Sequence, residues 1–279
     1  FVSEYAMGRT PNPCVECNRS VKFDEMLRQA ANLGADYLAT GHYAQIRYNE
    51  ISKRHELSRA YDLKKDQTYA LYTLTQYQLS KTLMPLGGLS SKEETRQIAR
   101  KYGLSVANKP DSQDICFVPK EGYTKFLADK APQTLTAGSI VDTSGKVRGQ
   151  HDGIANFTIG QRKRLPASAS GPLFVISLEP ATNTVVVGED SELFRDTFFV
   201  SNISWSSIAG LDGPMTVEAA IRYNGTPCKA EIEPVADSDF VKVTLSESQR
   251  AITPGQAAVF YDGDTVVGGG TIELHMQHN

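Results

Sequence analysis

The stretch FDEMLRQAANLGADYLATGH (residues 23–42) decides the fold class of this 279-residue sequence. Apolar residues recur at helical spacing in its first half: Phe23, Met26, Leu27, Ala30 and Leu33. Gly34 follows as a helix stop, so we expect a helix with one buried stripe. The apolar run at 36–40 comes next and predicts a short strand that is buried on both faces. A helix that leads into a buried strand is typical of an α/β domain.

Gly41 and His42 follow this predicted strand directly. In open parallel sheets, ligands bind beyond the carboxyl ends of the strands. Gly41 and His42 therefore lie where a nucleotide or substrate would bind. A tight turn at this position would also need a glycine.

The elements further along the chain change in kind near residue 130. We expect a hairpin formed by residues 44–48 and 55–60, followed by a helical segment at 67–83. A second helix is expected to start at Ser90 or Ser91 and to end near Gly103. From residue 134 onward we expect short strands and no long helix, with strands at 138–141, 174–178, 184–187, 217–223, 228–232, 241–245, 257–261 and 265–272. The evenly spaced strands predict a small β-barrel or sandwich. We expect an α/β portion followed by two β-rich modules.

Composition limits the functional classes. Hydrophobic residues make up 40% and charged residues 22% of the chain, and the formal net charge is −3. A polyanion would therefore have to bind a local basic patch. No apolar run approaches the roughly 20 residues that span a bilayer, so we expect no membrane partner. Four cysteines are too few for a disulfide scaffold and indicate a reducing compartment, which predicts a cytoplasmic protein.

Cys14 and Cys17 have the spacing of a metal clip or a redox pair. A zinc site needs two more ligands, and the remaining cysteines and five histidines offer no second pair at ligand spacing. A thioredoxin-type motif should open a helix, but prolines precede the pair and we expect the helix to begin only near residues 21–23. Simple packing in a turn is the third possibility. Spacing alone leaves all three open.

Two further cysteines stand apart from this pair. Cys116 follows a dense polar run and is enclosed by Ile115, Phe117 and Val118, which alone would indicate a core cysteine on a short strand. Cys228 lies on a predicted strand of the last module, where we expect it to pack.

Nine sequence blocks in order carry a resemblance to a known family. They are GRTPNPCVECN (8–18), VKFDEML (21–27), ATGHYA (39–44), LSRA (57–60) with KDQ (65–67), DSQDICF (111–117), FTIGQRK (157–163), IRY (221–223), ITPGQ (252–256) and GGGTI (268–272). Together they resemble the tRNA-specific 2-thiouridylase family of the MnmA type, over essentially the whole chain.

The resemblance implies a fold and a reaction. The fold would be the C-terminal part of a PP-loop α/β domain of the adenine nucleotide alpha hydrolase-like kind (1–128), a small β-rich central domain (129–195) and a C-terminal β-barrel that contacts tRNA (196–279). The reaction would be ATP-dependent 2-thiolation of the wobble uridine of tRNA, with Mg expected. ATP would adenylate the C2 oxygen, and a persulfide would then deliver sulfur.

The resemblance also implies roles for particular residues. Cys116 would bear the persulfide, supplied by a cysteine desulfurase or a sulfur-relay protein, and Cys17 would be the second catalytic cysteine, leaving a Cys17–Cys116 disulfide. Gly41 would contact the nucleotide through its backbone N–H. The expected tRNA contacts are Asn12, Pro13, Cys14, His42, Lys65, Asp66, Gln67, Arg222, Tyr223 and Gln256. Some relatives carry Asp at the position of Cys14, so we do not expect Cys14 to be catalytic.

One motif of the family is missing from the sequence. No Ser-Gly-Gly-x-Asp-Ser PP-loop, which would cradle the pyrophosphate of ATP, occurs in it. The sequence therefore resembles a fragment, which we expect to be unable to adenylate tRNA alone. The alternative is an ATP-independent module that binds tRNA and accepts sulfur, as a degenerate or split homologue. A zinc or dithiol redox protein is a further alternative.

Overall fold

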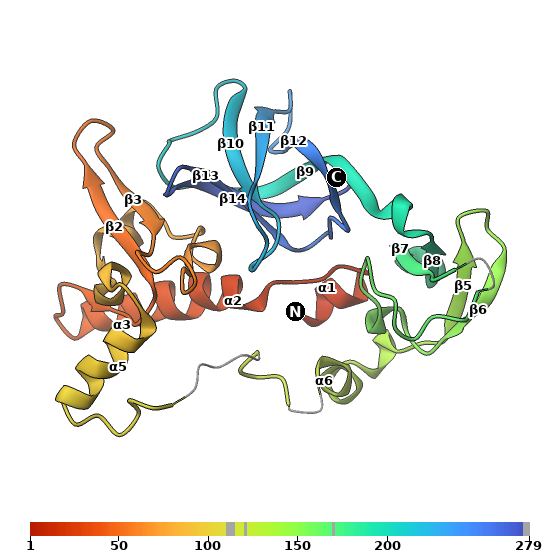
Figure 1. The fold of residues 1–279 in the computed structure, drawn as a ribbon, viewed down its shortest axis with the longest axis horizontal. Coiled ribbons are helices and arrows are strands. Elements are labelled where there is room, and N and C mark those ends of the chain that lie inside the picture. The colour runs from red at the N-terminus through yellow and green to blue at the C-terminus, as the bar shows by residue number, and fades with distance from the viewer. Residues whose placement is uncertain (110–114, 120–121, 169–170, 276–279) are drawn as a thin grey trace.

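The computed structural model describes residues 1–109, 115–119, 122–168 and 171–275 of the chain. Three groups of elements follow one another (Figure 1): helices with a β-hairpin, a small sheet at the other end of the molecule, and a β-barrel above the first helices. Motif residues 111–114 lie outside the described part. The predicted order of an α/β portion, a β-rich middle module and a C-terminal barrel is confirmed.

The first helices form a long run beneath the barrel (Figure 1). Helix α1 (Val2–Ala6) comes first and is followed by a short link. Three helical segments then continue one another without a break: α2 (Pro13–Glu16), the π-helical η1 (Cys17–Glu25) and α3 (Met26–Asn32). Gly34 ends the run with φ of 76°, as expected for a helix stop. Phe23 and Leu27 are buried as predicted, but Met26 and Leu33 are exposed, because nothing in the described part of the chain covers that side.

The predicted strand at 36–40 is shorter and less buried than expected. β1 (Leu38–Ala39) pairs in parallel with β4 (Thr82–Leu83), its only strand partner among the described residues. Leu38 is half-buried and Ala39 is exposed. The prediction of a strand buried on both faces was wrong, because a two-stranded sheet covers little of its own surface.

The hairpin is confirmed as β2 (Ala44–Asn49) and β3 (Arg54–Arg59). The helix predicted at 67–83 was wrong: the segment forms η2 (Thr68–Ala70), turns, α4 (Gln76–Ser80) and β4. Residues 68–72 are all buried, so packing on every side overrides the helical pattern. After η3 (Pro85–Gly88), α5 (Lys92–Lys101) begins as expected, with the Ser91 hydroxyl accepting the Glu94 N–H.

The middle module has its own small core. It comprises α6 (Tyr123–Lys130), η4 (Pro132–Thr134) and a sheet in the order β6-β5-β8-β7. The strand bounds are Gly138–Asp142 for β5, Val147–His151 for β6, Phe174–Glu179 for β7 and Thr184–Gly188 for β8. Three short 3-10 turns complete it: η5 (Ile154–Asn156), η6 (Pro180–Thr182) and η7 (Asp190–Leu193). Strand β6 was not predicted.

The last module is a closed barrel in the order β13-β10-β11-β12-β9-β14, with β14 pairing back to β13. Its strands are β9 (Phe194–Trp205), β10 (Met215–Ala220), β11 (Cys228–Pro234), β12 (Val241–Arg250), β13 (Ala257–Asp262) and β14 (Thr265–Glu273). Strand β9 was not predicted. The strand predicted at 217–223 ends earlier, so that Arg222 and Tyr223 lie in the loop after β10.

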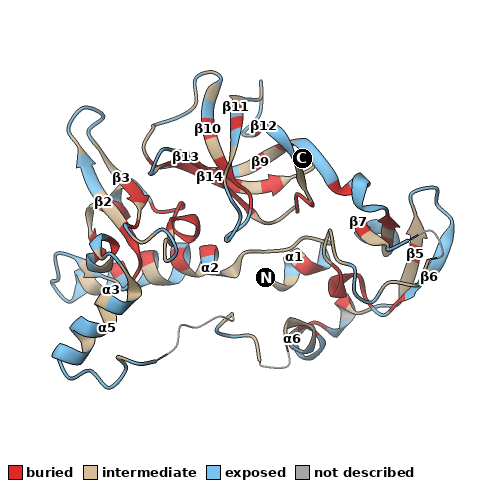
Figure 2. Cartoon of the chain, in the orientation of Figure 1, coloured by how far each residue is buried: buried red, intermediate tan, exposed pale blue. Residues whose placement is uncertain are grey.

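One hydrophobic core joins the helical part to the barrel. It includes Phe23 and Leu27 of the first helices, Leu57 of the hairpin, and Val259 and Tyr261 of the barrel. Figure 2 shows buried residues along the barrel and on the neighbouring hairpin and helices. The barrel is therefore held against the helix that carries Cys14 and Cys17. No helix in the described part of the chain is long and apolar enough to cross a membrane.

Candidate active site

The first helical turn carries the cysteine pair. Asn12 is the N-cap of α2, Pro13 occupies its first turn and Cys14 follows, while Cys17 begins η1. Proline suits this position because its fixed φ is helical and it lacks an N–H that would have no helical partner. The expectation that the helix begins only near residues 21–23 was wrong, because Pro13 starts it rather than preventing it.

All four cysteines are free. Cys14 and Cys116 are exposed and Cys17 is half-buried. Cys116 lies in a turn, so its interpretation as a core cysteine on a strand was wrong. Cys228 packs against the core of the barrel.

The thiols of Cys14, Cys17 and Cys116 lie close enough to influence one another electrostatically. Burial raises the pKa of the Cys14 thiol, the Lys22 ammonium opposes this shift, and negative charge on Cys116 or Cys17 adds to it. Charges act on one another strongly only at short range in a screened protein surface. Cys116 and Cys17, 99 residues apart in sequence, therefore both lie near Cys14.

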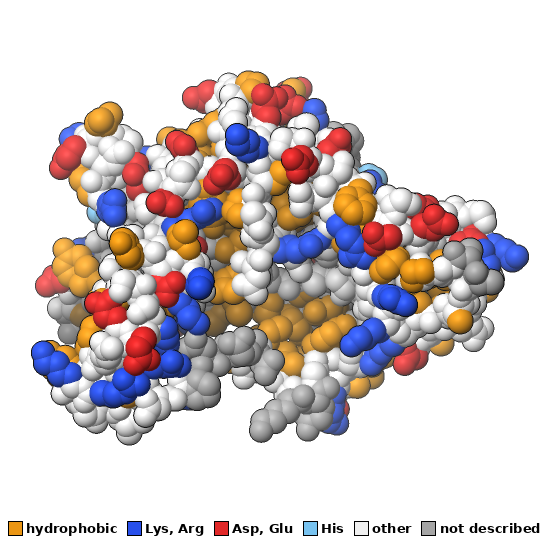
Figure 3. Space-filling view, viewed as in Figure 1, with side chains coloured by type: hydrophobic (Ala, Val, Ile, Leu, Met, Phe, Trp, Pro, Cys, Tyr) orange, Lys and Arg blue, Asp and Glu red, His pale blue; other side chains and the backbone are white. Residues whose placement is uncertain are grey.

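A cavity of about 620 Å³ lies between this helix and the barrel. Its lining includes Asn12, Pro13 and Cys17 from the helix start, Phe117 from the turn of Cys116, and Asn202 and Gly255 from the barrel. In Figure 3, hydrophobic side chains form a band across the middle of the molecule beneath the barrel, with Lys and Arg side chains on both sides. The cavity is large enough for a nucleobase and opens beside a thiol.

The predicted tRNA contacts from two distant segments meet near Cys14. The Tyr223 hydroxyl is hydrogen-bonded to the side chain of Gln67, and its pKa is raised by burial and by the negative charges of Asp66 and Cys14. The Tyr223 ring meets Tyr69 edge-on, with 5.9 Å between ring centroids. Lys65 also contributes a positive charge to the surroundings of Tyr223. Barrel and α/β portion thus share one surface here.

Asp66 and Gln67 also support the local fold. One carboxylate oxygen of Asp66 accepts the Ala60 N–H at 2.9 Å, and burial raises the pKa of this carboxyl. The side-chain oxygen of Gln67 accepts the Tyr43 N–H at 2.9 Å. These bonds hold the loop of residues 61–67 against the hairpin.

His42 is buried rather than presented to solvent. Its Nδ1 lies 3.0 Å from the Thr40 hydroxyl and its Nε2 lies 3.4 Å from Lys22 Nζ. Burial and the Lys22 charge lower the His42 pKa to about 4, so the ring is neutral at physiological pH. Its role as a tRNA contact remains a prediction, and it requires the ring to become more accessible.

Gly41, by contrast, is exposed at the carboxyl end of β1. A side-chain Cβ there would meet only Leu86 Cδ1, at 3.8 Å. The backbone at Gly41 is thus open to a ligand, as expected for a contact beyond a parallel strand.

Arg222 and Gln256 lie on the barrel end that faces the helices. The Arg222 side chain donates to the carbonyl oxygens of Arg250 and Ala251. Gln256 precedes β13, and its carbonyl accepts the Ile272 N–H at 2.8 Å. Gln256 directly follows Pro254 and Gly255, which contact Thr10 and Arg9.

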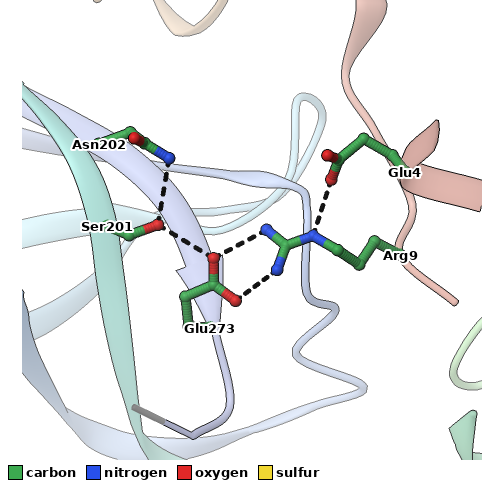
Figure 4. Close-up of polar contacts among 5 residues, drawn as sticks. All are labelled: Glu4, Arg9, Ser201, Asn202 and Glu273. Atoms are coloured by element: carbon green, nitrogen blue, oxygen red, sulfur yellow. Dashed lines mark hydrogen bonds and ion pairs between the residues drawn. The ribbon is translucent and has the colours of Figure 1, made fainter. Parts of the chain in front are cut away.

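Sequence reasoning missed two groups of this site. Arg9 forms ion pairs with Glu4 and Glu273 (Figure 4), and Lys22 lies between His42 and Cys14. Both residues lie inside the sequence blocks given above. Sequence patterns could not find them because Arg9 pairs with Glu273, far along the chain, and because a strand separates Lys22 from His42. Within the described residues, no group of three or more His, Cys, Asp or Glu side chains could hold a metal ion, so the zinc alternative has no support there.

Comparison with known proteins gives matches along the whole chain. Three family models match: tRNA methyl transferase HUP domain at 1–120, tRNA methyl transferase PRC-barrel domain at 124–189, and aminomethyltransferase beta-barrel domain at 195–272. The tRNA-specific 2-thiouridylase MnmA of Clostridium perfringens is 50% identical over 273 residues, 98% of this chain and 75% of the relative. Those of Halothermothrix orenii and Carboxydothermus hydrogenoformans are each 48% identical, over 98% and 99% of this chain and 75% of each relative.

Proposed function

The chain belongs to the tRNA-specific 2-thiouridylase family, and from that premise we propose that it is a tRNA sulfurtransferase which 2-thiolates the wobble uridine. The reaction exchanges the C2 oxygen of the base for sulfur. A free carbonyl oxygen is a poor leaving group, so it must be activated first. ATP would supply this activation by adenylating the C2 oxygen, and Mg would accompany it.

The observation that supports this proposal best is the shared cavity. Cys17 and Phe117, the neighbour of Cys116, line it together with barrel residues. A base has to leave the anticodon stack to reach a half-buried thiol such as Cys17. The cavity offers such a base a pocket with Asn12 and Pro13 on one side and the barrel on the other.

The two catalytic cysteines would act in sequence. A sulfur donor loads Cys116, which is exposed and accessible to a partner protein. The terminal sulfur of the Cys116 persulfide attacks C2 of the activated uridine and expels AMP. The Cys17 thiolate then attacks the Cys116 sulfur, which releases the thiolated base and leaves a Cys17–Cys116 disulfide. Alternatively, Cys17 attacks the persulfide first and frees hydrosulfide, which attacks C2. In both routes the transferred sulfur gains two electrons from the thiols, and an external thiol reductant resets the pair.

Cys14 would face the base without taking part in sulfur exchange. Because burial raises its pKa, its thiol stays protonated at neutral pH and is a weak nucleophile. A protonated thiol can still donate a weak hydrogen bond to a base. We therefore assign Cys14 to base contact, with Lys65, Asp66, Gln67, Tyr223, Arg222 and Gln256 as contacts to the tRNA around it.

Gly41 would contact the nucleotide. Its exposed backbone follows a parallel strand, and among the described residues only Leu86 Cδ1 comes within 4 Å of where a Cβ would lie. If the protein instead only binds tRNA and accepts sulfur, it would take up sulfur and bind tRNA but would not thiolate the base, with or without ATP.

Serine substitutions test the proposal in the complete gene product. We expect Cys17→Ser and Cys116→Ser each to abolish thiolation, because each removes one sulfur centre, and Cys228→Ser to leave it intact as the matched control. The thiolated-base content of tRNA, measured by mass spectrometry with and without ATP, is the readout. Normal content in either of the first two variants would refute the cysteine assignment. A wild type that binds tRNA and takes up sulfur but gives no thiolated base even with ATP would favour the accepting module.

A further inference from the structure

Residues 7–12 connect α1 to α2, and Arg9 and Thr10 in this link lie directly against the barrel. The Thr10 N–H donates to the Pro254 carbonyl at 3.0 Å. Gly255 has φ of 87°, and a Cβ at this position would lie 3.0 Å from Arg9 Cβ and 3.1 Å from Thr10 N. The two backbones are therefore in contact, with no room for a side chain between them.

Arg9 fixes this contact with its whole guanidinium group (Figure 4). Nη1 and Nη2 donate to the two carboxylate oxygens of Glu273 at 2.6 and 2.8 Å, and Nε donates to Glu4 at 2.7 Å. Glu273 also accepts the Ser201 hydroxyl at 3.0 Å. The side chains of Arg9 and Glu273 are only 16% and 13% exposed. A two-point Arg–carboxylate pair sets orientation as well as distance.

A second anchor follows three residues later. The Tyr69 hydroxyl donates to the Ala257 carbonyl at 2.8 Å, and the Asn12 side chain lies close enough to this hydroxyl to oppose the rise of its pKa by burial. Asn12 is the N-cap of the helix that carries Cys14 and Cys17. Arg9 and Asn12 thus tie the start of this helix to two neighbouring points on the barrel, Glu273 and Ala257.

Two carboxylates already neutralise Arg9, so its charge is not offered to a phosphate. We propose that Arg9 is a positioning residue for sulfur transfer: it fixes the start of the Cys17 helix against the barrel, so that a tRNA held by the barrel presents its base to Cys17. This inference rests on the proposed function. Displacement of a reacting group by about 1 Å can lower a rate on the order of 100-fold.

The test compares three variants of the complete gene product. Arg9→Met keeps the length of the side chain and removes the ion pairs. The triple variant Arg9→Glu, Glu273→Arg and Glu4→Gln restores an ion pair in the opposite sense and removes the Glu4 carboxylate that the new acidic side chain would otherwise face. Lys242→Met, which removes the barrel ion pair with Glu233, is the matched control.

Steady-state thiolation is the first readout. We expect Arg9→Met to lower kcat by about 10- to 100-fold while KM for tRNA changes by less than about threefold, because the barrel still binds tRNA. The charge swap should recover at least about tenfold of the lost kcat, and Lys242→Met should change neither constant. An unchanged kcat in Arg9→Met, or a loss that appears only in KM, would overturn the proposal.

Hydrogen exchange of the Thr10 amide is the second readout and needs no activity. We expect this amide, bonded to Pro254 in the folded protein, to exchange at least about tenfold faster in Arg9→Met than in the wild type or Lys242→Met. Equal exchange would overturn the positioning role. A wild type that fails to thiolate tRNA would refute the proposed function instead. In that case the exchange data would still test whether Arg9 holds residues 9 and 10 against the barrel.

Discussion

The buried His42 makes the stability of the protein depend on pH. Its ring packs against Phe23, with 5.5 Å between ring centroids, and its Nε2 lies 3.4 Å from Lys22 Nζ. Burial and the neighbouring ammonium both disfavour the imidazolium, so the His42 pKa falls from 6.5 to about 4. The perturbation we consider is His42→Gln, which keeps a polar side chain that can accept from Lys22 but does not titrate.

The size of the effect follows from this pKa difference. Between pH 6.5 and pH 4, His42 is protonated in the unfolded chain but neutral in the folded chain. The favourable contribution is therefore complete above the unfolded pKa and is lost as the pH falls toward the folded pKa. At pH 5 the loss is about 2 kcal/mol, and below pH 4 it reaches about 3.4 kcal/mol.

Urea unfolding at pH 7 and pH 5 measures this difference. We expect the free energy of unfolding of the wild type to fall by about 2 kcal/mol more than that of His42→Gln between these two conditions. His55→Gln, at a half-buried histidine on β3, controls for the loss of any histidine. Equal pH dependence in the wild type and His42→Gln would refute the assignment of a buried, neutral His42.

Two other predictions concern the barrel contact and the tRNA surface. Gly255→Ala should lower the free energy of unfolding by about 1–3 kcal/mol, because the new Cβ meets Arg9 and Thr10 at positive φ. In Gly263→Ala the φ is also positive but the space is open, so thermal denaturation should give a smaller loss, and equal losses would contradict the steric explanation. Lys65→Ala should weaken tRNA binding several-fold and lower the slope of log affinity against log salt by about one. An unchanged salt slope, measured by filter binding, would remove Lys65 from the phosphate contacts.

Local signals explain which elements could be predicted. Helix α5 was found because Ser91 and Glu94 satisfy its first turn without help from the rest of the fold. Strand β9 was missed because polar Arg195 and Asp196 interrupt its alternation and because its partners, β12 and β14, lie far along the chain. The helix predicted at 67–83 failed for a related reason, since tertiary packing buries consecutive residues there on every side.

The candidate site also has a part that the sequence could indicate and a part that depends on tertiary packing. Sequence blocks single out Cys17 and Cys116 as candidates, which stay a prediction, but no spacing rule could bring Tyr223 near Cys14 or Glu273 onto Arg9. These contacts depend on how the barrel docks on the first helices, which is a property of the shared core. The sequence therefore names candidate residues one by one, while the contacts between them require the fold.

The shared core also constrains how the protein folds during synthesis. Phe23 and Leu27 share one core with the barrel residues Val259 and Tyr261, which are synthesised about 230 residues later. At the usual rate of synthesis of about 5–20 residues per second, this interval lasts on the order of 10–50 seconds. During that time the apolar stripe of the nascent Cys17 helix is exposed, while the middle module, with a core of its own, can already fold. The thiols of the site thus acquire their surroundings only after the last strands of the barrel have been added.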